Sequence, residues 1–407
     1  MSEESADRAQ PAGDAQAPRR RRRRIAVTAG AAAAGLVVLG VPVTTFALSG
    51  SAGSGQPASA PANSPEQPVH LQVGRQSDVQ PNATSSASEA PGSPAAASDY
   101  HAFISFAGAG AVAEVDTTTH TILGEPVSAD TTEGVAVTPD GSQIFAAQTG
   151  QYSVVAVNTT TKAKTTIEVG AYPQDVAVTP DGQQVYATVT GGDTGPGGSN
   201  AVAVIDVSTD AVASDITVGA GPRQVVFSPD GSRAYVTTET SIAVIDTATG
   251  KVIKTIPDPA GPQGIAVSPD GKSLYVTNPD AGQLLVLDAA TGLPRAVISA
   301  GAEPYSVAVT PDGSTAYVAD MNADSVVAVS TASHRIVATM PTGLLPGSVG
   351  IVPDGSQVWV GNVESGSVTV INPATNTVSG TITFAAGTAP LDGVPLGMAF
   401  VKATPAS

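Results

Sequence analysis

The sequence predicts an all-β protein in which residues 101–401 form a seven-bladed β-propeller with four-stranded blades. The tripeptide Pro-Asp-Gly occurs six times, at steps of 41, 49, 40, 42 and 42 residues. A polar turn after an apolar strand occurs seven times, at steps of 42, 48, 40, 42, 42 and 42 residues. A period of about 40–45 residues is typical of propeller blades. The Pro-Asp-Gly turns start at Pro139, Pro180, Pro229, Pro269, Pro311 and Pro353, and the polar turns at Asp116, Asn158, Asp206, Asp246, Asp288, Ser330 and Asn372.

One repeat, residues 264–298, shows how a blade is built. Its four expected strands are residues 264–268 nearest the axis, then 273–278, 283–288 and, at the outer edge, 295–298. Pro-Asp-Gly joins the first two strands. Proline presets φ at the first turn position and glycine supplies a positive φ, so we interpret this tripeptide as a turn and not as a ligand motif.

The two ends of the repeat region complete one another. Seven polar turns accompany only six Pro-Asp-Gly turns, and the N-terminal segments 102–106, 111–115 and 121–123 supply three strands without an inner partner. Residues 395–400 match residues 262–267, the start of an inner strand, but the rest of a blade does not follow them. We therefore predict a composite blade, made from both termini, that closes the ring and removes its open sheet edges.

The second strand of each repeat carries a recognisable tetrapeptide. With the preceding Ala-Val-Ser/Thr-Pro-Asp-Gly strands, it resembles the YVTN family of β-propeller repeat proteins over roughly residues 101–401. The resemblance implies the propeller fold and an exported or surface-attached protein, and it implies no particular reaction. The tetrapeptides are Phe145-Ala146-Ala147-Gln148, Tyr186-Ala187-Thr188-Val189, Tyr235-Val236-Thr237-Thr238, Tyr275-Val276-Thr277-Asn278, Tyr317-Val318-Ala319-Asp320 and Trp359-Val360-Gly361-Asn362.

The first hundred residues differ from the rest in composition. Residues 1–24 end in six arginines, so we expect them to lie in the cytoplasm by the positive-inside rule. Residues 25–48 carry no charge and as a helix would span about 36 Å, more than a bilayer core of about 30 Å. We predict a signal-anchor helix that tethers the propeller outside the cell membrane, or a signal peptide whose cleavage would make the protein secreted. The Ser/Ala/Pro/Gly-rich residues 49–100 are predicted to be a disordered linker, and residues 402–407 a tail.

Charge and cysteine content restrict the function. The formal net charge is −17, and without residues 1–24 it is 11 − 31 = −20. Such an acidic domain repels phosphates, so we expect no nucleic-acid partner. The chain has no cysteine, which excludes thiolate metal sites and covalent haem attachment through cysteine.

We expect a binding site where the blades converge at one end of the central channel. Antiparallel connectivity brings the loops before the inner strands and the loops after the second strands to the same face, the mouth of the channel, where ligands bind by default. A Gly-rich insertion, residues 191–199, is predicted to be a mobile loop at its rim. The candidates are Glu133, Gln174, Asp175, Arg223, Gln263, Tyr305, Gly347 and Leu396 before the inner strands, and Gln148, Asn278, Asp320 and Asn362 at the ends of the second strands.

These residue types favour binding over catalysis but leave the question open. We assign no catalytic or metal-binding residue and no cofactor, because the four histidines, His70, His101, His120 and His334, are predicted to lie away from the mouth. The preferred interpretation is a binding module for an extracellular protein, peptide or glycan. The alternative is a hydrolase similar to propeller lactonases, with a divalent cation such as Ca²⁺ held by oxygen ligands. Those ligands would come from Glu133, Asp175, Asp320, Asn278 or Asn362.

Overall fold

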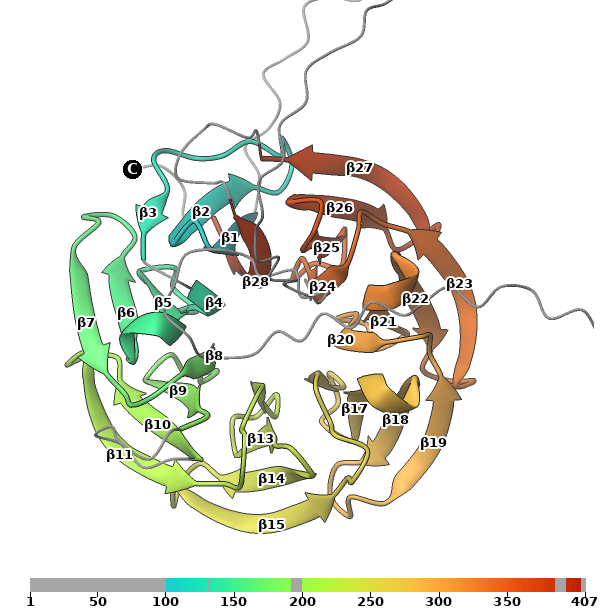
Figure 1. Cartoon of the computed structure of the whole chain (residues 1–407), viewed down its shortest axis with the longest axis horizontal. Helices are drawn as coiled ribbons and strands as arrows, with labels where there is room; N and C mark the ends of the chain where they lie inside the picture. The colour runs from blue at the N-terminus through green and yellow to red at the C-terminus, as the bar shows by residue number, and fades with distance from the viewer. Residues whose placement is uncertain (1–99, 130–131, 192–199, 385–392, 404–407) are drawn as a thin grey trace, which may run out of the picture. The chain divides into compact units, whose positions relative to one another are not determined.

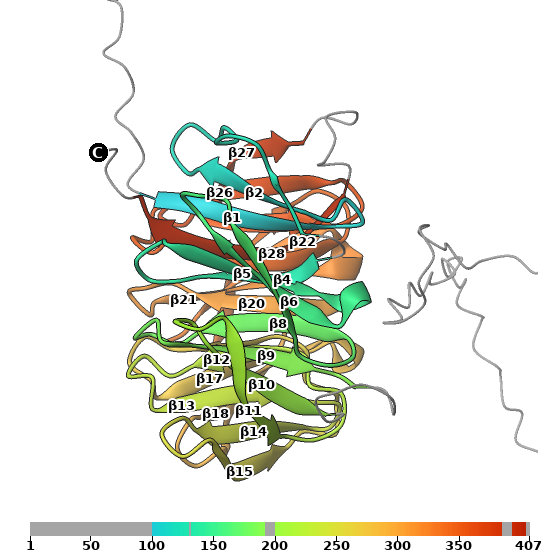
Figure 2. The ribbon, with the colours of Figure 1, turned by 90° about the vertical axis from the view of Figure 1, so that its left-hand side faces the viewer.

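The computed structural model describes residues 100–129, 132–191, 200–384 and 393–403. They form seven antiparallel sheets of four strands each, arranged as blades around a central axis (Figure 1). Seen from the side, the strands run between the two faces of the ring (Figure 2). The prediction of an all-β, seven-bladed propeller with four-stranded blades is confirmed.

The strands of each blade are given from the axis outward. Blade 1 contains β28 (Val394–Lys402), β1 (Tyr100–Ala107), β2 (Ala111–Asp116) and β3 (Val127–Ser128), and blade 2 contains β4 (Thr132–Val137), β5 (Gln143–Gln148), β6 (Ser153–Asn158) and β7 (Lys164–Glu168). Blade 3 contains β8 (Pro173–Val178), β9 (Gln184–Val189), β10 (Ala201–Asp206) and β11 (Ala211–Thr217), and blade 4 contains β12 (Val225–Phe227), β13 (Arg233–Thr237), β14 (Ser241–Asp246) and β15 (Lys251–Pro257).

The remaining three blades follow the same plan. Blade 5 contains β16 (Ile265–Val267), β17 (Ser273–Asn278), β18 (Gln283–Asp288) and β19 (Pro294–Ser299). Blade 6 contains β20 (Pro304–Val309), β21 (Thr315–Asp320), β22 (Ser325–Ser330) and β23 (Arg335–Pro341), and blade 7 contains β24 (Pro346–Ile351), β25 (Val358–Asn362), β26 (Ser367–Asn372) and β27 (Thr377–Thr383). Three 3₁₀ turns, η1 (Thr149–Gln151), η2 (Pro279–Ala281) and η3 (Met321–Ala323), follow second strands.

The N-terminal predictions fall outside the described residues. This applies to the basic segment 1–24, the apolar segment 25–48, residues 49–99 of the linker and the tail from residue 404 onward. Tyr100, which we assigned to the linker, opens β1. None of the helices in the described ranges is long and apolar enough to cross a membrane.

Blade 1 is the composite blade predicted from the sequence. Its innermost strand, β28, pairs antiparallel with β1, from Tyr100 opposite Lys402 to Ala107 opposite Val394. The outer strand was predicted in the wrong place. Within residues 121–123 only Ile122 forms an isolated bridge to β2, and the outer strand is β3. The reason is a turn at Gly124, whose φ of 68° ends the extended segment before the chain returns to the sheet edge.

The Pro-Asp-Gly tripeptides are turns at the face of the ring opposite the mouth, which we call the turn face. In blade 5, Oδ1 of Asp270 accepts hydrogen bonds from the Ser268 hydroxyl at 2.6 Å and from the Lys272 N–H at 3.0 Å. These bonds stabilise the ionised carboxylate and lower its pKa. The aspartates of four other turns accept the same pair of bonds: Asp140, Asp181, Asp230 and Asp312.

Hydrophobic clusters fill the spaces between neighbouring blades. Tyr275 of blade 5, for example, packs with Val307 and Val318 of blade 6. Trp359 of blade 7 is fully buried among residues of blades 7 and 1, and its ring meets that of Phe400 edge-on at 5.7 Å. The aromatic residue that opens each tetrapeptide is thus a core residue.

Candidate functional site

Each inner strand begins with a short motif that faces the axis. In six blades a proline comes first, then a residue of varying chemistry, then a second variable residue and an apolar residue. We call the residue after the proline, or after Thr132 in blade 2, the mouth residue. The seven mouth residues are Glu133, Gln174, Arg223, Gln263, Tyr305, Gly347 and Leu396.

Hydrogen bonds from the neighbouring blade fix the backbone of several mouth residues. Thr277, the third residue of its tetrapeptide, donates its hydroxyl to the carbonyl of Tyr305 in blade 6 at 2.8 Å and accepts the N–H of Gly264 at 2.8 Å. Thr188 donates in the same way to the carbonyl of Arg223 at 2.8 Å. Thr237 does so to Gln263, and Ser105 to Glu133. The hydroxyl that recurs in the tetrapeptide therefore joins one blade to the next and positions the mouth.

The residue after each mouth residue makes a second set of contacts between blades. Oδ2 of Asp175 accepts the N–H of Val225 at 3.0 Å, and Oε1 of Gln224 accepts the N–H of Ile265 at 2.7 Å. Where this position is Gly264, a Cβ would lie 2.6 Å from the carbonyl oxygen of Tyr305, so the backbones are too close for any side chain. This second position is therefore largely structural.

The mouth residues surround one cavity of about 200 Å³ on the axis. All seven of them line it, together with Asp175. The structure thus brings eight of the twelve candidate residues into one cavity: Glu133, Gln174, Asp175, Arg223, Gln263, Tyr305, Gly347 and Leu396. The sequence analysis did not single out Gln224, Ser306, Ser348 and Met398, which also line it. Their position directly after or near a mouth residue was the available signal.

The other four candidates, Gln148, Asn278, Asp320 and Asn362 at the ends of second strands, are not among the residues that line this cavity. Gln148 is buried and donates from Nε2 to the carbonyl of Ala129 at 2.5 Å. Asn278 is buried and donates from Nδ2 to Oδ1 of Asp258 at 3.1 Å. Asp320 accepts the N–H of Ala302 at 2.9 Å and that of the following residue at 2.8 Å. Asn362 donates to two hydroxyls of β26 at 3.1 and 3.0 Å. The expectation that these side chains line the mouth cavity is wrong, because they bond to the loops that lead from one blade to the next or, for Asn362, to the neighbouring strand β26.

Burial changes the acidity of the groups at the mouth. It raises the pKa of Glu133 to about 7, with a smaller contribution from the nearby charge of Asp175. Burial also raises the pKa of Asp175 to about 7, although the hydrogen bond from Val225 acts in the opposite direction. Both side chains retain some exposed surface, so each carboxyl group is largely enclosed by protein and open to the cavity.

Tyr305 connects opposite sides of the mouth electrostatically. Burial raises the pKa of its hydroxyl, the charge of Glu133 raises it further, and the charge of Arg223 lowers it. The hydroxyl in blade 6 is therefore within electrostatic range of an acid in blade 2 and a base in blade 4. Nη1 of Arg223 donates to Oε1 of Gln263 at 2.7 Å and to the carbonyl of Pro262 at 3.3 Å, so the guanidinium group is held at the rim.

The donor set for a metal ion at the mouth is small. Of the oxygen ligands proposed for a divalent cation, only Glu133 and Asp175 line the cavity. No group of three His, Asp or Glu side chains suited to a metal ion occurs within the described parts of the chain. His101 contacts Glu114 at 2.8 Å and His120 lies 3.2 Å from Gln357, both away from the cavity. The predicted rim loop lies outside the described residues, apart from Gly191.

Comparisons with known proteins agree with the fold. Residues 118–312 match the model of a family described as YNCE-like β-propellers. A chain of Kuenenia stuttgartiensis hydrazine synthase is 26% identical with a TM-score of 0.60, and the alignment covers 67% of this chain and 92% of that one. A functionally unknown protein from Desulfotomaculum acetoxidans is 16% identical with a TM-score of 0.62, covering 75% of this chain and 99% of the other.

A third similar structure is a putative 6-phosphogluconolactonase from Bacteroides uniformis, at 19% identity and a TM-score of 0.59, covering 75% of this chain and 100% of that one. No curated protein matches the sequence. Identities this low show a shared propeller fold and carry no substrate or reaction to this chain. The chemistry of the mouth must therefore be argued from its own residues.

Proposed function

We propose that this protein is an extracytoplasmic binding module, tethered to the membrane through residues 25–48, whose ligand enters the mouth of the propeller channel. The observation that supports the proposal is the convergence on one cavity of seven mouth residues of six different kinds. Two neighbouring positions scarcely change from blade to blade: the one before, which is proline in six blades, and the one two residues after, which is always apolar. A position that faces a cavity, and whose residue differs between blades while its neighbours stay the same, is suited to ligand recognition.

The lining indicates what kind of ligand the mouth takes. Carboxyl groups of Glu133 and Asp175 lie in blades 2 and 3, and the guanidinium of Arg223 and the amide of Gln263 lie in blades 4 and 5. A ligand that bonds to both sides presents hydrogen-bond donors as well as acceptors, as peptides and glycans do. A cavity of about 200 Å³ corresponds to about six or seven water molecules. The ligand therefore inserts one side chain or one sugar ring, and the rest of it lies over the mouth face.

The experiment is a screen of the full-length chain, solubilised in detergent, against peptide and glycan arrays. We expect ligands whose signal falls at least tenfold with Arg223→Ala or Glu133→Gln. Asp312→Asn, at a turn on the opposite face, is the matched control and should leave the signal unchanged. Array hits that all three variants bind equally, or the absence of any hit, would contradict the proposal. Membrane fractionation of the chain with and without residues 25–48 tests the tether separately.

A hydrolase with a divalent cation at the mouth is the second candidate. The adjacent carboxyl groups of Glu133 and Asp175, both with a pKa near 7, favour it, because a cation would displace their protons and neutralise the pair. A cation that binds only the folded state raises the melting temperature. If neither Ca²⁺ nor EDTA shifts the melting temperature of the purified chain, this candidate is eliminated and the binding module is unaffected.

A further inference from the structure

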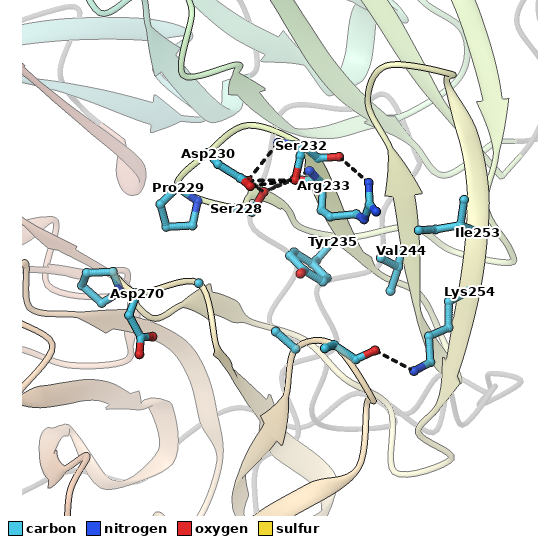
Figure 3. A pocket seen from close by; sticks show the side chains of 14 residues that line it. Ser228, Pro229, Asp230, Ser232, Arg233, Tyr235, Val244, Ile253, Lys254 and Asp270 are labelled. Atoms are coloured by element: carbon cyan, nitrogen blue, oxygen red, sulfur yellow. Dashed lines mark hydrogen bonds between the residues drawn. The ribbon is translucent and has the colours of Figure 1, made fainter.

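A cavity of about 470 Å³ lies between blades 4 and 5 at the turn face (Figure 3). Its charged side chains already have partners within the protein. Arg233 donates to Asp246 at 2.7 Å, and Lys254 donates to the carbonyl of Ala290 at 3.1 Å. None of the buried side-chain atoms that lack a partner in the described residues belongs to its lining. This cavity therefore shows no built site for a ligand.

A pair of tyrosines lies instead on the mouth face, where blades 2 and 3 meet. Tyr152 follows η1 and directly precedes β6, and Tyr172 directly precedes β8. Figure 1 shows η1 beside the inner strands of these two blades. The two rings meet edge-on, with centroids 5.6 Å apart and planes at 87°. Tyr152 is 46% exposed and Tyr172 is partly exposed, so we call these two side chains the aromatic pair and treat them as a surface.

Both tyrosines have a backbone conformation that disfavours large side chains. Their φ angles are 59° and 55°, in the left-handed region, where glycine is unhindered and asparagine and aspartate are tolerated. The residue directly before the third strand is left-handed in six blades, and apart from Tyr152 it is Gly110, Asn200, Gly282, Asp324 or Gly366. The residue before the proline of the inner strand is left-handed in four blades, as Tyr172, Gly221, Gly261 and Leu345. The local backbone therefore does not account for a tyrosine at either position.

Hydrogen bonds from the surrounding backbone hold both tyrosines in place. The carbonyl of Tyr152 accepts the N–H groups of Val169 at 3.1 Å and Gly170 at 3.2 Å. The carbonyl of Tyr172 accepts the N–H of Thr190 at 3.2 Å. A side-chain hydrogen bond with Tyr152 raises the pKa of the Tyr172 hydroxyl, which stays protonated at neutral pH. The aromatic pair is thus pre-organised and kept exposed in disfavoured backbone angles, which indicates a role in recognition.

The groups beside the aromatic pair suit a sugar ring. An aromatic face is the negative part of the ring's quadrupole and attracts the C–H groups on the apolar face of a pyranose. The hydroxyls of a sugar need hydrogen-bond donors and acceptors, and Gln174 and Asp175 of the mouth cavity present both. Only Pro173 separates Tyr172 from Gln174, so the Cα atoms of these two residues lie at most about 7 Å apart. Neighbouring sugars of one short glycan can therefore reach the aromatic pair and the cavity.

Other ligands fit the same surface less well. A peptide docks through free backbone groups or rows of apolar pockets, whereas the carbonyls of Tyr152 and Tyr172 already accept hydrogen bonds. An acidic glycan is repelled by a chain with a net charge of −17. A neutral glycan meets neither obstacle.

We propose that the aromatic pair stacks on one ring of a neutral pyranose glycan whose neighbouring sugar enters the mouth cavity. The inference rests on the proposed function and names its ligand class. In this arrangement the open aromatic face contacts the axial C–H groups of the ring, and the tyrosine hydroxyls and Gln174 bond to the hydroxyls at its edge.

Saturation-transfer NMR of the full-length chain, solubilised in detergent, tests this with named probes. The probes are cellotetraose, tetra-N-acetylchitotetraose and β-1,4-galactotetraose, with the open-chain polyol sorbitol and tetraproline amide as controls. Irradiation of the aromatic protons should transfer saturation to axial C–H protons of at least one oligosaccharide and not to sorbitol. Absence of transfer to all three oligosaccharides, equal transfer to sorbitol, or tighter binding of tetraproline amide would each overturn the proposal.

Substitutions within the aromatic pair use residues that other blades carry at the same positions. Tyr152→Asn and Tyr172→Gly should each weaken oligosaccharide binding at least fivefold while the melting temperature stays the same or rises, because the left-handed backbone is relieved. Tyr152→Phe keeps the ring and should change binding less than twofold. Val297→Ala, which shortens an exposed apolar side chain on the outer strand of blade 5, is the control and should change nothing. Unchanged binding in both Tyr152→Asn and Tyr172→Gly would overturn the proposal.

Mouth variants separate this inference from the proposed function. Oligosaccharide binding that depends on both tyrosines but on neither Arg223 nor Glu133 would support the stacking site and contradict the mouth as the place where the ligand enters. Peptide ligands that depend on Arg223 and Glu133 but on neither tyrosine would support the mouth and overturn the glycan assignment.

Discussion

The turn face and the mouth of the propeller are built from the same repeat, yet their residues differ in how much they vary from blade to blade. At the turn face, five aspartates accept a hydroxyl at 2.5–2.6 Å and a backbone N–H at 3.0 Å, with almost no change from blade to blade. At the mouth, an acid, two amides, a base, a phenol, a glycine and a leucine occupy one equivalent position. Comparing repeats within one chain thus separates residues that build the frame from residues available for recognition.

The frame depends on closing the ring, and removing the closing strand is the largest expected disruption. Deletion of residues 394–407 takes away β28, so β1 loses its inner partner and Phe103 and Trp359 lose the packing of the last strand. We expect loss of the cooperative thermal transition in circular dichroism, because an open sheet edge and a split core remain. Deletion of residues 404–407 alone is the control and should not change the melting temperature. An unchanged transition in the longer deletion would show that the ring does not need closure.

Sequence periodicity predicted this frame well because turn chemistry is local. Proline, aspartate and glycine specify the turn wherever they occur together, so their spacing gave the blade number and the composite closure. The outer strand of blade 1 was missed because its edge is interrupted at Gly124 and resumes at Val127, with no repeat of its own to compare.

The site was predicted in part, for a reason that lies in strand geometry. Successive side chains of a strand point to opposite faces, so knowing that Thr277 and Asn278 end a strand does not say which neighbour each one meets. Thr277 bonds to the next blade, and Asn278 bonds to Asp258 in the loop between blades 4 and 5. The electrostatic link of Tyr305 to Glu133 across the axis depends on the radius of the ring, which no local pattern encodes.

Glycines test how tightly the mouth is held by its frame. Gly264→Ala would place a Cβ 2.6 Å from the Tyr305 carbonyl oxygen and 2.9 Å from the Thr277 hydroxyl, so blades 5 and 6 must separate. We expect a loss of about 2–3 kcal/mol in the free energy of unfolding, measured by urea titration. Gly380→Ala, on the outer strand of blade 7, meets nothing within 4 Å and should be neutral or stabilise by about 0.5 kcal/mol. Similar losses in both variants would mean that the mouth is no more tightly packed than the rim.

The smallest expected effect comes from one carboxyl group at the mouth and one at the turn face. These two groups compare the regions directly. Folding raises the pKa of Glu133 from 4.5 to about 7, so the folded state holds an extra proton between these values and stability falls as pH rises through this window. Glu133→Gln removes that dependence. The variant should match the wild type near pH 4.5 and be more stable at pH 8, by on the order of 1–2 kcal/mol.

Asp312 at the turn face should behave in the opposite way. Hydrogen bonds from the Thr310 hydroxyl and the Ser314 N–H lower its pKa, so its ionised form stabilises the folded state above its usual pKa of 3.8, and this contribution is lost as pH falls. Asp312→Asn should therefore be less stable than the wild type at pH 8, with a difference that shrinks toward pH 3. Thermal melts of both variants between pH 3 and pH 8 measure the direction in which the stability of each variant, relative to the wild type, changes with pH. If both variants are less stable than the wild type at pH 8, then the ionised Glu133 side chain stabilises the fold, and the residues of the mouth do not lower folding stability in favour of ligand binding.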